Sequence, residues 1–264
     1  MTPPMPLPTP PPDFHWTEEP WGPMLRCRAL DVFVQHGFTS RQLGLRPGER
    51  TGEAWASAAA SVGCAVPRIG RVRQVHGAVV RVVRAGELDQ PAPDADAAVT
   101  RDPGTAVAVV AADCVPVLLA DPVTGAVAAV HAGWRGTAAN IVGATVATLT
   151  REWGVEPSSL IAAIGPSIGP CCYDVGEDLL RAFDEAGHSP VDRAEWFSRD
   201  AAGRLRLDLW RANADALVHA GVRPANIHVA GLCTQTHRDV FESFRAEGDQ
   251  AGRMAAIVVA PARG

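Results

Sequence analysis

Two apolar runs within residues 106–142 constrain the fold more than any other part of the chain. Cys114 follows the first run, and His131 ends the second. Between them the segment DPVTG at 121–125 contains the Asp, Pro and Gly of a tight turn, so we expect the two runs to lie side by side with their ends close together. A helical pattern follows, with Thr137 as its expected N-cap. The sequence therefore predicts that a thiol, an imidazole and a helix N-terminus converge.

The rest of the chain favours one large domain. Its 264 residues suffice to bury a full core, and 47% hydrophobic with 20% charged residues is typical of globular proteins. Strand and helix patterns follow one another without strict βαβ alternation, which favours a mixed sheet over a purely parallel one. We therefore expect a single α/β (α+β) domain over residues 15–264, preceded by a disordered, proline-rich tail over residues 1–14.

Local patterns predict several elements around the two apolar runs. Residues 31–40 are typical of a strand that ends at His36, and residues 51–64 of an alanine-rich helix. Residues 68–83 form an alternating strand pattern, interrupted where His76 precedes a glycine. Further along the chain we expect helices over about 177–186 and 209–220 and a final buried strand.

Composition also excludes several classes of function. The net charge of -5 and the scattered arginines argue against a nucleic-acid surface. No apolar stretch reaches the ~18 residues of a membrane span, and the N-terminus lacks the pattern of a signal peptide, so we expect a cytoplasmic protein. The six cysteines are sparse, and we interpret them as reduced thiols.

Three side chains have the chemistry of a catalytic zinc site, which uses three protein ligands and leaves a fourth position open. His76, Cys114 and His131 each lie at an expected strand end beside glycine or proline. Copper binds the same ligand types, so it stays an alternative metal. Asp113 precedes the thiol and is the candidate to orient one of the imidazoles.

A nucleophilic cysteine is the rival interpretation of the same residues. Cys114 would attack, and His131 or His76 would act as its base. The sequence does not separate a thiolate that binds a metal from one that attacks carbon. Two imidazoles, rather than one imidazole with an Asn or Asp partner, favour the metal.

Binding of an anionic or planar substrate would need guanidinium groups, backbone amides and aromatic rings. For the anion the candidates are Arg41, Arg245, Arg253 and the helix N-terminus after Gly136, and for a flat base Phe38, Trp134 and Phe244.

An ordered series of motifs then identifies a family. The segments are HGFTSR, RQVHG, DAAVT, AADCVPVLLAD, AVHAGWRGT, IGPSIGPCCYDVG and SFRAEGDQAGRMA. In this order and at these intervals they resemble the bacterial laccase-domain or polyphenol oxidase family, also described as purine nucleoside phosphorylase and adenosine deaminase. The resemblance extends from about Val32 to Val259 and is weakest over residues 41–50 and in GLCTQTHRD.

The resemblance implies mixed β-sheets sandwiched between helices and a catalytic zinc. By motif match the metal ligands and catalytic residues are His76, Cys114 and His131. From the candidates above, we select Phe38, Arg41, Arg245 and Arg253 as the substrate-binding residues. The implied partners are a purine nucleoside and phosphate, in a monomer or weak homodimer.

The implied reactions are phosphorolysis of adenosine, inosine and methylthioadenosine, and deamination of adenosine by a metal-activated water. Two alternatives remain open at this point: a copper-dependent polyphenol oxidase, and a hydrolase that edits peptidoglycan precursors.

Overall fold

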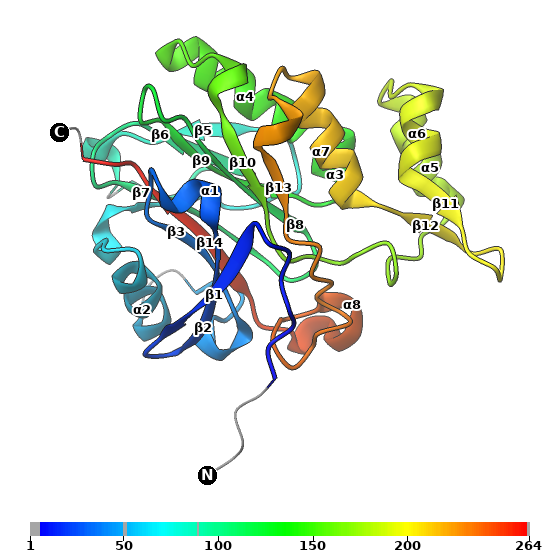
Figure 1. The fold of residues 1–264 in the computed structure, drawn as a ribbon, viewed down its shortest axis with the longest axis horizontal. Coiled ribbons are helices and arrows are strands. Elements are labelled where there is room, and N and C mark those ends of the chain that lie inside the picture. Colours follow the sequence, from blue (N-terminus) through cyan, green and yellow to red (C-terminus); the bar gives the residue numbers. More distant parts are fainter. Residues whose placement is uncertain (1–5, 50–51, 89, 263–264) are drawn as a thin grey trace.

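Two six-stranded sheets pack face to face in the computed structural model, which describes residues 6–49, 52–88 and 90–262 (Figure 1). The first sheet has the order β1-β2-β3-β14-β7-β4. Its strands are β1 (Phe14–Glu19), β2 (Gly22–Cys27), β3 (His36–Thr39), β14 (Met254–Val259), β7 (Ala106–Ala111) and β4 (Ile69–Gly70). Most pairs are antiparallel, but β4 runs parallel to β7. The sheet is therefore mixed, as predicted.

The second sheet has the order β13-β10-β8-β9-β6-β5 and is also mixed, because β13 and β5 run parallel to their neighbours. Its strands are β13 (Ile227–Val229), β10 (Ile161–Ile164), β8 (Val115–Ala120), β9 (Val127–Ala132), β6 (Ala97–Thr100) and β5 (Val80–Val82). A small separate sheet pairs β11 (Phe197–Arg199) with β12 (Leu205–Leu207).

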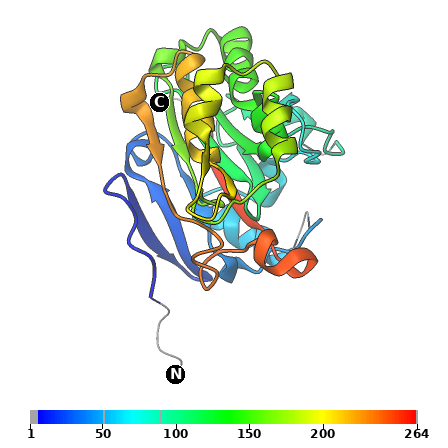
Figure 2. The same ribbon diagram turned by 90° about the vertical axis from the view of Figure 1, so that its right-hand side faces the viewer.

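Helices cover the outer faces of both sheets, which confirms the expected sandwich. The longer ones are α2 (Glu53–Ser61), α4 (Ile141–Trp153), α5 (Glu177–Glu185), α6 (Pro190–Trp196) and α7 (Leu209–His219). The short ones are α1 (Arg28–Asp31), α3 (Trp134–Ala138) and α8 (Phe244–Glu247). Seen from the side in Figure 2, the blue strands of the first sheet and the green strands of the second form two layers, with the green, yellow and orange helices beyond the second. No helix among the described residues is long and apolar enough to span a membrane.

Three apolar clusters hold these layers together. One lies between the sheets, where side chains such as Leu25, Val109 and Leu118 are at most 1% exposed. A second packs α4 and α7 on the second sheet, and a third packs α2 on the first through Trp55. The central strands β8 and β9 are buried on both faces, which explains why their sequences are continuous apolar runs rather than alternating ones.

The segment 106–142 forms three strands rather than two runs. The first run supplies β7, which belongs to the first sheet, whereas β8 and β9 form a hairpin in the second. The turn at 121–125 closes that hairpin as predicted: the Asp121 carboxylate accepts hydrogen bonds from the backbone of Val123 and Thr124. Pro116 lies opposite His131, so Cys114 and His131 meet at one end of the hairpin.

Several predicted boundaries differ from the structure. His36 begins β3 rather than ending a strand, because residues 28–31 turn into α1. The strand expected over 68–83 is divided into β4 and β5, and residues 71–79 between them form an irregular loop. Thr137 is not an N-cap: α3 already begins at Trp134, and the capping side chain of α4 is Asn140, which accepts a hydrogen bond from the Gly143 amide.

Most of the proline-rich segment lies against the first sheet. Leu7 packs on the cluster between the sheets, and the Trp16 indole donates a hydrogen bond to the carbonyl of Pro8 at 2.9 Å. Phe14 is 2% exposed and begins β1. Residues 6–14 therefore differ from the disordered tail expected over 1–14, because prolines keep carbonyl acceptors that can anchor an extended segment. The first five residues lie outside the described part of the chain.

The fold contains a histidine that must stay neutral. His36 is fully buried, and its Nε2 accepts a hydrogen bond from the amide of Cys27 at 2.9 Å. Burial lowers the pKa of His36 from 6.5 to about 4. As the pH falls, the unfolded chain therefore protonates His36 before the folded chain does. The stability that neutral His36 contributes is complete above about pH 6.5 and is lost as the pH falls through about 4.

We predict that His36→Gln reduces the decrease in the free energy of unfolding between pH 7 and pH 4. Wild type should lose about 3 kcal/mol more than the variant between pH 7 and pH 4, by linkage at this one group. Urea unfolding at a series of pH values measures the difference. His219→Gln, at a side chain that is 60% exposed, is the control. Equal pH dependence in wild type and His36→Gln would contradict the assignment.

Candidate metal centre

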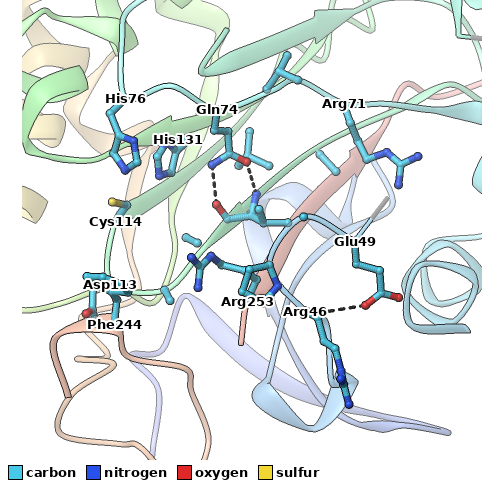
Figure 3. Close-up of a pocket in the computed structure, with 18 of the residues that line it drawn as sticks. Arg46, Glu49, Arg71, Gln74, His76, Asp113, Cys114, His131, Phe244 and Arg253 are labelled. Atoms are coloured by element: carbon cyan, nitrogen blue, oxygen red, sulfur yellow. Dashed lines mark hydrogen bonds between the residues drawn. The ribbon is translucent and has the colours of Figure 1, made fainter. Parts of the chain in front are cut away.

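His76, Cys114 and His131 come together in the structure (Figure 3). Their ligand atoms all lie within 4.8 Å of one another. His131 comes from β9, Cys114 directly precedes β8, and His76 lies in the loop 71–79. The β8–β9 hairpin therefore places two of the three side chains, and an irregular loop delivers the third.

Asp96 positions both imidazoles. This carboxylate is fully buried and accepts hydrogen bonds from three consecutive backbone amides, those of Val75, His76 and Gly77, at 3.2, 2.9 and 2.6 Å. It also binds Nδ1 of His131 at 2.9 Å. With Nδ1 donating to the carboxylate, Nε2 of His131 is the nitrogen left to bind a metal.

Charges within the cluster favour a thiolate. Burial alone would raise the pKa of Cys114, but His131 and His76 outweigh it and lower that pKa to about 6. Burial would lower the pKa of His131, but the Cys114 sulfur and the Asp96 carboxylate outweigh it and raise that pKa to about 9. The sulfur is thus held in the form that binds a metal, and equally in the form that a nucleophilic cysteine needs.

Position 133, beside the cluster, leaves no room for a residue larger than glycine. A Cβ atom on Gly133 would lie 2.8 Å from the Cys114 sulfur and 3.3 Å from a ring carbon of His76. His76 itself has a φ of 61°, in the left-handed region that non-glycine residues rarely adopt. Such backbone strain is typical of functional sites, where the surrounding hydrogen bonds hold it in place.

Asp113 does not orient an imidazole, contrary to the sequence-based hypothesis. Its carboxylate accepts hydrogen bonds from the Thr234 hydroxyl at 2.5 Å and from the Arg245 amide at 2.6 Å. Asp113, the residue before Cys114, therefore anchors the segments that contain Thr234 and Arg245. Asp96 takes the expected orienting role, and no pattern in the sequence distinguishes it from the neighbouring carboxylate of Asp94.

The cluster opens into a cavity of about 610 Å³. In Figure 3 it lies on one side of this cavity, with Arg46, Glu49 and Arg71 on the other. Five guanidinium groups line the cavity against two carboxylates, those of Glu49 and Asp113. The arginines are Arg46, Arg71, Arg73, Arg245 and Arg253. The cavity is therefore suited to an anion, although the chain as a whole is acidic.

The structure places two of the four predicted substrate-binding residues at the cavity. Arg245 lines it with the guanidinium 5.1 Å from the Tyr173 ring centre, and the same side chain donates a hydrogen bond to the Asp174 carbonyl. Arg253 also lines it, from the residue before β14. Phe244 lies at the cavity as well and is 49% exposed.

Phe38 and Arg41 lie elsewhere, which corrects the prediction for both. Phe38 is 2% exposed in the cluster between the sheets, where its ring fills the space beside Gly165. Arg41 pairs with the carboxylates of Glu242 and Glu247. Trp134 packs against the apolar cluster between the second sheet and helices α4 and α7, and it does not line the cavity.

Sequence patterns missed several cavity residues because they lie in irregular segments. Gln74 forms two hydrogen bonds with the backbone of Val110, at 2.7 and 2.8 Å, which fix the loop 71–79 to β7. The Arg71 guanidinium lies 4.6 Å from the Trp55 ring centre. The alternating pattern that suggested a strand over 68–83 would instead place successive side chains on opposite faces.

Comparison with known proteins identifies the family. The family model for multi-copper polyphenol oxidoreductase laccase matches residues 35–261. The chain belongs to this family. That result confirms the resemblance found from the motifs.

Several relatives of this chain have names that refer to purine nucleosides. A purine nucleoside phosphorylase of Deinococcus radiodurans is 38% identical over 253 residues, which cover 89% of this chain and 93% of that protein. The adenosine deaminase RL5, from an unknown prokaryotic organism, is 38% identical over 188 residues, 69% of this chain and 71% of that protein. The crystal structure of YlmD from Geobacillus stearothermophilus has a TM-score of 0.82 at 30% identity, with 94% of this chain and 99% of that chain covered.

We predict that Asp96→Asn weakens the binding of Zn²⁺, added as a probe, to the candidate site by about 10–100-fold, because an orienting partner of a metal-binding imidazole typically contributes that much. The ring signals of His76 and His131, followed by NMR during titration with Zn²⁺, measure the affinity. Asp94→Asn is the matched control, because Asp94 is exposed and pairs with Arg73. Equal affinities in the two folded variants would contradict the role of Asp96.

Proposed function

We propose that this chain is a zinc-dependent enzyme of purine nucleosides. It catalyses phosphorolysis of adenosine, inosine and methylthioadenosine, and deamination of adenosine. The observation that carries the proposal is a His–Cys–His ligand set that opens into a cavity lined by arginines. Relatives named purine nucleoside phosphorylase and adenosine deaminase support the choice of substrate.

The donor set fits a zinc ion. Two imidazoles and one thiolate are ligands of catalytic zinc sites, and three protein ligands leave a position for water or substrate. Asp96 holds His131 in the required orientation, and the thiolate form of Cys114 is favoured without a metal. Copper uses the same donors, so the proposal of zinc depends on the purine chemistry rather than on the ligands alone.

Phosphorolysis needs a bound phosphate beside the sugar. An oxygen of phosphate attacks C1′ of the nucleoside, the C1′–N9 bond breaks, and its electron pair leaves with the purine. Arg245 and Arg253 hold the phosphate in this proposal, because guanidinium groups bind phosphate oxygens in pairs and neutralise their charge. Phe244 and Tyr173 provide aromatic surface for the base.

Deamination uses the same bound base with water in place of phosphate. The oxygen of water adds at C6 of adenine and the C6–N bond breaks. One proton of water leaves with the amino group as ammonia, and the other remains on N1 of the resulting hypoxanthine ring. A bound zinc supplies the Lewis acidity that makes water reactive near neutral pH. The residues of the chain hold the ligands in place, through Asp96 and Gly133, and keep the base beside them.

The decisive measurement combines metal analysis with chromatography of adenosine incubated with and without phosphate. We expect adenine and ribose 1-phosphate only when phosphate is present, and inosine in both cases. His76→Ala and Cys114→Ala should abolish both reactions while the chain stays folded, and His219→Ala should retain both.

Two results would overturn the proposal. Intact nucleosides with a zinc-loaded protein would favour a wall-precursor hydrolase. Oxygen uptake with a phenol, in proportion to bound copper and independent of phosphate, would favour a polyphenol oxidase.

The arginines allow the two reactions to be separated. We predict that Arg245→Gln and Arg253→Gln each raise the KM for phosphate by about 10–100-fold, the loss of a charged hydrogen bond to an anion, and leave adenosine deamination unchanged. Steady-state kinetics of both reactions measure the split. Arg41→Gln, outside the cavity, is the matched control and should change neither. Equal losses in both reactions would place these arginines on the nucleoside instead.

A further inference from the structure

Three of the six cysteines form a second cluster, apart from the His76–Cys114–His131 site. The sulfur atoms of Cys171, Cys172 and Cys233 all lie within 4.8 Å of one another, and those of Cys171 and Cys172 are 3.6 Å apart. None of the three lines the large cavity. Among the described residues they make up one of two groups with the composition and spacing of a metal site.

The fold brings these thiols together through two adjacent loops. Strands β10 and β13 pair in parallel, and the pairing continues past their ends, where Ser167 lies opposite Cys233. The loop after β10 then turns back, because the amides of Cys172 and Tyr173 both donate to the Gly169 carbonyl. That turn places Cys171 and Cys172 beside Cys233, although they are more than 60 residues apart in the sequence.

Hydrogen-bond donors surround the sulfur atoms. The Gly169 amide donates to the Cys233 sulfur at 3.3 Å, and the Thr236 hydroxyl lies 3.5 Å from the Cys172 sulfur and 3.7 Å from that of Cys171. Such donors stabilise negative charge on a sulfur atom, as a thiolate ligand of a cation requires.

We propose that this cluster is a second metal site, which takes a thiophilic cation such as Zn²⁺, Cd²⁺ or Cu⁺ through three thiolates. Two thiolates at about 2.3 Å from one zinc in tetrahedral geometry lie about 3.8 Å apart, close to the observed spacing of the sulfur atoms. Each thiol that binds releases its proton to solvent. A disulfide, at about 2 Å, would use two of the sulfur atoms and leave the third without a role.

The bound cation would clamp two loops that reach the large cavity. Ile168 and Tyr173 flank Cys171 and Cys172 in the first loop, and both line the cavity. Thr234 follows Cys233 in the second loop and donates to Asp113, the neighbour of Cys114. The proposal concerns ligation alone, so it stands whether or not the cavity acts on nucleosides.

The test uses the full chain with the first site removed by His76→Ala and Cys114→Ala, in the presence of a thiol-free reductant. Titration with Cd²⁺ should bind one ion per chain and produce the ultraviolet sulfur-to-cadmium charge-transfer band. The melting temperature should rise with Cd²⁺. Adding Cys171→Ser and Cys172→Ser should abolish the band and the rise, whereas adding Cys64→Ser, at a thiol outside both clusters, should change neither.

Two results would overturn the proposal. One is the absence of a stoichiometric ion in the variant that keeps all three thiols. The other is an unchanged band after the serine substitutions. Should the double serine variant fold poorly, Cys171→Ser alone at an exposed position must still lower the Cd²⁺ affinity by at least tenfold. An unchanged affinity there contradicts the three-thiolate site.

Discussion

One buried carboxylate holds both histidines of the candidate metal centre in place. Asp96 binds three consecutive amides of an irregular loop and one ring nitrogen on the adjacent strand. Burial alone would raise the pKa of Asp96, but these hydrogen bonds and the nearby imidazole lower it, so the group stays ionised. Removal of this charge would leave the buried Nδ1 of His131 without its acceptor, at a cost of about 1–3 kcal/mol, and would release three part-buried amides of the loop.

The three candidate metal ligands were predictable because each is marked by its immediate neighbours. Cys114 and His131 bound apolar runs that join through a recognisable turn, and His76 precedes a glycine in an otherwise regular pattern. Asp96 was not predictable, because it lies 20 residues from His76 and 35 from His131. Only the pairing of β6 with β9 brings it to His131, and strand pairing is a long-range property.

The arginines also differ in whether their positions could be predicted from the local sequence. Arg41 and Arg253 have similar surroundings in the sequence, each in a loop beside a strand, yet only Arg253 reaches the cavity. Arg41 turns instead toward two carboxylates on a segment about 200 residues away. Which arginine faces the cavity thus depends on partners that no local pattern reveals. The same reasoning applies to Phe38, whose aromatic ring packs in the apolar cluster between the two sheets.

The position of β14 has a consequence for how the protein is made. This strand lies in the middle of the first sheet, between β3 and β7, although it follows every other strand in the sequence. During synthesis β7 emerges long before its neighbour and must keep an apolar edge with free amides and carbonyls until residues 254–259 arrive. Arg253 immediately precedes that strand, so the first sheet and this part of the cavity wall depend on the same late pairing.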